Sequence, residues 1–70
     1  MRYTRHAQRR MAERNLTPLD VLDAVENHEV AFTDKKGNSC LVRNIDGRRI
    51  KVVVAATDAE LVITVIDLDA

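Results

Sequence analysis

The hydrophobic positions of the first part of the chain recur with helical spacing. Tyr3, Ala7 and Met11 repeat every four residues and make a narrow apolar stripe. The stripe predicts a helix from about Thr4 to Arg14, with Thr4 as its N-cap. Asn15 follows, and asparagine tolerates the left-handed conformation that ends many helices.

A second helix is predicted directly after the first. Thr17 is a good N-cap, and Pro18 falls at the first helical position, where its missing N–H costs nothing. The helix should end near Asn27. The residues expected to face inward from it are Leu19, Val21, Leu22 and Val25.

From Val30 onward the apolar pattern becomes typical of strands. Asp46-Gly47 is a strong hairpin signal. The predicted strands are Val30–Thr33, Cys40–Ile45, Arg49–Ala56 and Leu61–Leu68. We therefore expect one α+β domain over residues 1–70, with two N-terminal helices packed on one face of a four-stranded antiparallel sheet.

The face on which each strand side chain lies depends on the register of the hairpin. A two-residue loop at Asp46-Gly47 mixes charge into both faces, so we favour a three-residue loop ending at Gly47. The predicted core face is Cys40, Val42, Ile50, Val52, Val54, Leu61, Ile63 and Val65. The predicted outer face is Leu41, Arg43, Arg49, Lys51, Val53, Val62, Thr64 and Ile66.

The charges cancel, with 11 basic and 11 acidic residues, but they are unevenly spread. Basic residues gather in the first helix and in the middle of the chain, while acids gather in the second helix and at the C-terminus. This suits either a phosphate partner or internal charge balance. The predicted register places Arg43 opposite Arg49, which is unfavourable unless an anion lies between them; the alternative is an ordinary solvated face.

Several kinds of site lack their sequence signals. There is no glycine-rich phosphate loop, and no His or Cys spacing suits a metal, so we expect no metal and no cofactor. The single cysteine, Cys40, excludes an internal disulfide, fits a reducing compartment and is expected to be buried. The chain has only two aromatic residues, and this scarcity argues against aromatic base stacking as the basis of RNA binding. With no apolar run of about 20 residues and no signal segment, we expect a cytoplasmic protein with no membrane partner.

Three segments together resemble a bacterial family catalogued as domain of unknown function 4258. Residues 6–17, HAQRRMAERNLT, resemble its opening H-A-x-x-R-M-x-x-R-G-hydrophobic-S/T. Residues 46–54 and 62–65 resemble its D-G-R-x-L-x-V-V-V and V-I-T-V segments. The resemblance runs from about Tyr3 to Asp67, with Asn15 in place of the usual Gly and Ile66 where many members carry Tyr.

The resemblance implies a relation to barnase, EndoU, colicin and RelE-type ribonucleases, and to toxins of toxin–antitoxin or polymorphic toxin systems. It implies catalytic roles for His6, Arg10 and Thr64. In the resulting hypothesis of a metal-independent endoribonuclease, His6 is the general acid or base, since histidine titrates near neutral pH. The residues expected to bind the phosphate substrate are Arg14, Arg43, Arg49 and Lys51.

The expected partners are RNA and a cognate antitoxin protein. The alternative is a non-catalytic RNA-binding or protein-interaction module with the same fold. The hypothesis makes one geometric demand: His6 and Arg10 on the helix layer must meet Thr64 at an open edge between helix and sheet.

Overall fold

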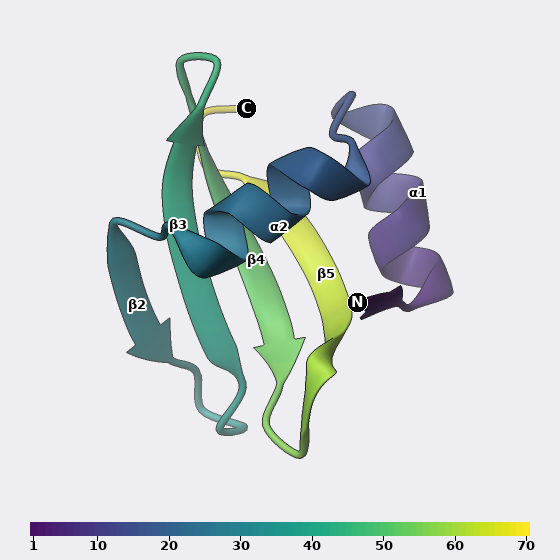
Figure 1. Ribbon diagram of the computed structural model, residues 1–70, viewed down its shortest axis with the longest axis vertical. Coiled ribbons are helices and arrows are strands. Elements are labelled where there is room, and N and C mark those ends of the chain that lie inside the picture. The colour runs from purple at the N-terminus through teal and green to yellow at the C-terminus, as the bar shows by residue number, and fades with distance from the viewer.

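A short extra strand makes the sheet larger than the sequence pattern predicts. The computed structural model describes all 70 residues and has two helices on one face of a five-stranded sheet, as Figure 1 shows. The elements are β1 (Arg2–Tyr3), α1 (Arg5–Glu13), α2 (Pro18–Glu26), β2 (Val30–Thr33), β3 (Ser39–Ile45), β4 (Arg48–Ala55) and β5 (Asp58–Asp67).

The α+β class and the two helices are confirmed, but the prediction of four antiparallel strands is wrong. The strand order is β1-β5-β4-β3-β2, and β1 pairs with β5 in parallel while all other neighbours are antiparallel. Two residues are too few to show an alternating pattern, so β1 leaves no periodic signal in the sequence.

Helix α1 begins where its N-cap ties it to the sheet. The hydroxyl of Thr4 accepts a hydrogen bond from the backbone N–H of Ala7 (3.0 Å) and donates one to the carbonyl of Ile63 on β5 (2.6 Å). Ala7 and Met11 are buried against the core. The C-cap is Arg14, and Asn15 takes the left-handed conformation with φ 54°. The start of α1 is therefore fixed directly above β5.

Helix α2 lies across β3 and β4 and begins with a complete capping box between Thr17 and Asp20. Its buried residues are Val21 and Ala24, whereas Leu19 is 76% exposed and Leu22 is also exposed. The prediction that both leucines face inward is wrong, because the small Ala24 is the residue that seats the helix on the sheet. Neither helix is long and apolar enough to cross a membrane.

The β3–β4 hairpin uses a two-residue loop. Asp46 and Gly47 both have positive φ (53° and 83°), as a type I′ turn requires, and Ile45 pairs with Arg48. The predicted three-residue loop is therefore wrong. The observed loop does place a charged residue on each face, and on the face beneath the helices this residue is Arg43, for which α2 supplies an acidic partner.

The register moves several side chains to the face opposite the predicted one. Leu41 and Ile45 join Ile50, Val52 and Val54 in the core beneath the helices. Cys40 and Val42 are buried as expected, but they lie outside that core, on the sheet face that no helix covers, which we call the open face.

A β-bulge in β5 changes which of two neighbouring residues, Val62 or Ile63, lies in the core. Val53 pairs with Thr64 but Val54 pairs with Val62, so Ile63 is the extra residue between them. Val62 is consequently fully buried in the core, where we predicted Ile63. The predicted placement of Thr64 and Ile66 away from the core is confirmed, because neither joins the core cluster.

Candidate functional site

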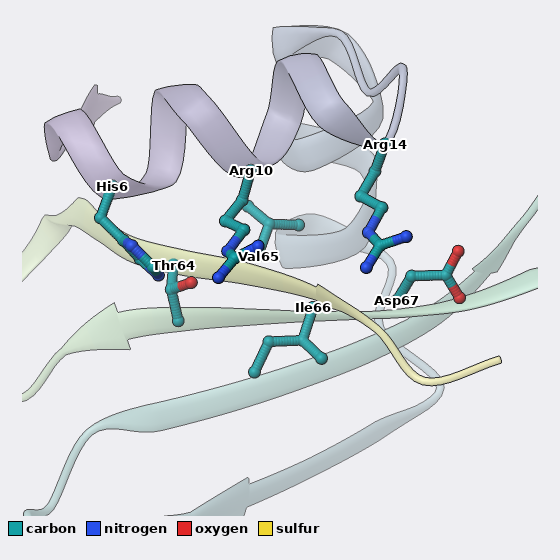
Figure 2. A pocket seen from close by; sticks show the side chains of 7 residues that line it. All are labelled: His6, Arg10, Arg14, Thr64, Val65, Ile66 and Asp67. Atoms are coloured by element: carbon teal, nitrogen blue, oxygen red, sulfur yellow. The ribbon is translucent and has the colours of Figure 1, made fainter. Parts of the chain in front are cut away.

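One side of α1 carries a row of basic side chains that faces β5. His6, Arg10 and Arg14 follow one another at intervals of four residues, so they project from the same side of the helix. Together with β5 they line a cleft of about 340 Å³. Figure 2 shows the three side chains extending from α1 into this cleft.

The opposite wall of the cleft is the second half of β5. Its lining residues are Thr64, Val65, Ile66 and Asp67. Thr64 follows the bulged Ile63 directly and is half-buried, with its hydroxyl at the cleft wall. His6, Arg10 and Thr64 therefore do meet at an open edge between helix and sheet. The catalytic and substrate-binding roles expected of them stay predictions.

The cleft is electropositive and only partly neutralised. The guanidinium of Arg10 lies 2.9 Å from Glu13, one turn along the same helix and exposed to solvent. The side chains of Arg14 and His6 make no hydrogen bond or ion pair with the rest of the chain. An exposed pair such as Arg10–Glu13 is worth only about 0–1 kcal/mol, so an anion entering the cleft can replace Glu13 at little cost.

The single carboxylate of the cleft, Asp67, belongs to a structural contact that the sequence did not reveal. Its side chain is 7% exposed, and one carboxylate oxygen lies 3.5 Å from the guanidinium of Arg48. The same guanidinium donates a hydrogen bond to the backbone carbonyl of Arg14 (2.7 Å). Arg48 thus links Asp67 to the C-terminal end of α1 and offsets the negative charge of Asp67. No local sequence signal marks a contact between residues so far apart.

The three strand cations that were expected to bind substrate are separated by the observed register. Arg43 donates from Nε to Asp23 of α2 (2.8 Å) and from Nη1 to the carbonyl of Asn27 (2.9 Å). It faces the helices, so its predicted place on the open face is wrong. The pKa of Asp23 is lowered, first by the hydrogen bond from the side-chain amide of Asn27 and then by the one from Arg43. Arg43 ties the end of α2 to β3 and does not line the cleft.

Arg49 and Lys51 also lie outside the cleft. Arg49 is paired with Asp69 through its guanidinium (2.8 Å), and this hydrogen bond raises the pKa of Arg49 and lowers that of Asp69. Lys51 lies on the open face with its ammonium 5.8 Å from the centre of the Phe32 ring. Of the expected phosphate ligands, only Arg14 therefore stands beside His6, Arg10 and Thr64.

No group of three or more His, Cys, Asp or Glu side chains is arranged to hold a metal ion. Cys40 is buried at 1% exposure and free of any disulfide. The cleft thus presents one imidazole, two guanidinium groups, one hydroxyl and one carboxylate, that of Asp67, which is already paired with Arg48. Such a set can bind a phosphate, stabilise charge on it and exchange a proton with a neighbouring hydroxyl.

Comparison with known proteins gives one match. The family model described as Domain of unknown function (DUF4258) matches residues 3–67, which is nearly the whole chain and includes every residue of the cleft. No curated protein and no solved structure is significantly similar to the chain.

Proposed function

Because the chain belongs to the family described as Domain of unknown function (DUF4258), whose description assigns no activity, we propose a function from the cleft: binding and metal-independent cleavage of RNA. One observation supports this above all. An imidazole, two arginines and a threonine hydroxyl, brought from α1 and β5, line one open cleft. The resemblance to ribonuclease toxins points to the same residues.

In the proposed reaction the 2′-hydroxyl of one nucleotide attacks the adjacent phosphorus. His6 accepts the proton of that hydroxyl, and the departing 5′ oxygen takes a proton from water, which reaches the cleft because it is open. Arg10 and Arg14 hold the non-bridging oxygens and stabilise the charge that develops on them. Thr64 donates a hydrogen bond to the same phosphate and fixes its orientation.

The electrostatics of the cleft favour an anionic substrate. Arg14 has no partner within the chain, and Arg10 has only the exposed Glu13. The negative charge of Asp67 is already offset by Arg48. A phosphodiester entering between α1 and β5 therefore meets free cationic donors and no uncompensated carboxylate.

The test is cleavage of an end-labelled RNA by the purified chain in the presence of a metal chelator. We expect products that end in a 2′,3′-cyclic phosphate. Losing a general acid or base typically lowers the rate about 10²–10⁴-fold, so the His6→Ala variant should cleave RNA more slowly by that factor. Thr64→Val should also lower the rate, because it removes the hydroxyl and keeps the shape of the side chain.

The matched control for lost charge is Arg9→Ala. Arg9 lies on the same helix and is exposed, but it does not line the cleft. The Arg9→Ala variant should cleave RNA at the rate of the unaltered chain, whereas the Arg10→Ala and Arg14→Ala variants should cleave it more slowly. Cleavage undiminished by His6→Ala would refute the mechanism. As the toxin of a toxin–antitoxin or polymorphic toxin system, the chain should also arrest growth on expression, and His6→Ala should relieve the arrest.

A second function, RNA binding without turnover, is favoured by the composition of the cleft. His6 is its only side chain suited to proton transfer near neutral pH, since Asp67 is engaged by Arg48. By the resemblance to the family pattern, Ile66 also stands at a position where a tyrosine is expected. Binding that weakens with salt, with no cleavage of any RNA, would identify this function instead.

A further inference from the structure

A second depression adjoins the cleft on the open face of the sheet. It has a volume of about 430 Å³, and its floor is apolar, with Phe32 on β2, Val53 on β4 and Ile66 on β5 among its residues. Thr64 and Ile66 line both this depression and the cleft. A ligand held in the cleft can therefore continue across β5 into the second depression without leaving the surface.

All the lysines of the chain line this second depression. Lys35 and Lys36 come from the loop after β2, Lys51 comes from β4, and none of them takes part in an ion pair. Three uncompensated cations around an apolar floor make a surface that attracts anions.

The one carboxylate of the depression, Asp34, is used by its own loop. Its oxygens accept hydrogen bonds from the backbone N–H groups of Lys36 and Asn38, each at 2.9 Å, and from the amide of Asn38 at 3.2 Å. These bonds, chiefly the backbone bond from Asn38, lower the pKa of Asp34. Asp34 shapes the loop that presents the lysines, and it forms no ion pair with them.

The floor offers an exposed ring and an exposed aliphatic side chain. Phe32 is 48% exposed and Ile66 is 38% exposed. An aromatic ring stacks on the flat face of a nucleobase, whichever base is present, and an aliphatic side chain beside it adds apolar contact. The low aromatic content argues against a stacking platform as the main basis of binding, but a single ring beside a phosphate site is enough for one base.

We propose that the second depression binds the nucleotide next to the phosphodiester held in the cleft. Its base lies against Phe32 and Ile66, and its phosphate is held by the lysines. This inference rests on RNA being the ligand of the cleft, as proposed above. An acidic protein segment would meet the lysines as well, but the shared wall formed by Thr64 and Ile66 makes the two depressions one continuous track, which suits a nucleic-acid strand.

The experiment measures binding of a labelled 2′-O-methyl oligouridylate of about ten nucleotides, a length within the range of single-strand sites. The methyl group removes the attacking hydroxyl, so binding is read independently of cleavage. Fluorescence anisotropy is recorded over a series of salt concentrations. For the Lys35→Gln/Lys36→Gln/Lys51→Gln variant we expect the slope of log affinity against log salt to become shallower by about 0.7, the value for one lost phosphate contact on a single strand.

Phe32→Leu tests the floor without changing charge. It should weaken binding by about fivefold or more, because it replaces the ring by an aliphatic side chain. Leu19→Ala is the matched control, since Leu19 is exposed but lies on α2 outside both depressions. Arg9→Gln is the control for charge, and both controls should bind as the unaltered chain does.

The outcomes separate this inference from the proposed function. If the lysine and Phe32 variants bind normally while Arg10→Gln does not, the second depression is not a nucleotide site and the cleft assignment stands. If the variants lose binding as expected but no RNA is cleaved, the nucleotide site stands and the catalytic proposal fails. Failure of the unaltered chain to bind the oligonucleotide overturns both. Displacement of the oligonucleotide by polyglutamate of equal charge would assign the depression to an acidic protein partner and overturn the inference.

Discussion

Ala7 is the position where the fold and the cleft depend on each other most directly. Its side chain is fully buried, and it lies on the face of α1 that packs against β5, next to His6. Ala7→Leu adds three carbon atoms at a fully buried site, so α1 must move outward from β5. Overpacking of this kind typically costs about 1–3 kcal/mol.

That loss is large for a chain of 70 residues, whose total stability should be about 4–10 kcal/mol. Each kcal/mol corresponds to about 4–8 °C in Tm for a domain of this size. The same displacement moves His6 and Arg10 away from Thr64, so RNA cleavage should fall in the fraction that remains folded.

Thermal and urea unfolding, followed by circular dichroism, measure the effect on stability. Ala12→Leu is the matched control: it makes the same change in the same helix at an exposed position, where substitutions usually stay within about 0.5 kcal/mol. Equal Tm values for the two variants would refute the close seating of α1 on β5.

Two further predictions concern contacts that hold the frame. Thr4→Val removes the N-cap of α1 and the bond to the carbonyl of Ile63, so urea unfolding should show a loss of about 1–2 kcal/mol that Thr4→Ser largely restores; no loss would contradict the capping role. The hydrogen bond from Arg49 keeps the pKa of Asp69 below its ordinary 3.8, so its contribution to stability is complete above that pH and disappears as the pH falls through the lowered pKa. The Asp69→Asn variant should therefore be less stable than the unaltered chain near neutral pH, and the two stabilities should converge in acid. A stability difference independent of pH would contradict this. Glu26→Gln, at an exposed position without an ion pair, is the control.

Much of the local structure could be predicted because its signals lie within a few residues of each other. The cap at Thr4, the Thr17-Pro18 start of α2 and the turn at Asp46-Gly47 were each identified at the observed position. The placement of His6 beside Arg10 on one side of α1 also follows from helical spacing alone. What this spacing left open was the partner that the row faces.

The register could not be predicted because it depends on contacts between distant residues. Sorting charges by face assumed that no arginine lies under the helices, yet Arg43 does so, since Asp23 stands above it, 20 residues earlier in the chain. The bulge at Ile63 also depends on distant residues. It lets Val62 enter the core, while the carbonyl of Ile63 accepts a hydrogen bond from the hydroxyl of Thr4.

By itself the sequence determined the two helices, the position of the β3–β4 turn and the alignment of His6 with Arg10 in the basic row on α1, because local hydrogen bonds and periodicity specify them. Only the tertiary structure decided that this row faces Thr64, that Arg48 offsets Asp67, and that the three lysines gather beside the cleft. These arrangements depend on strand register and on the packing of α1 against β5, which are set by the whole core and not by any one segment.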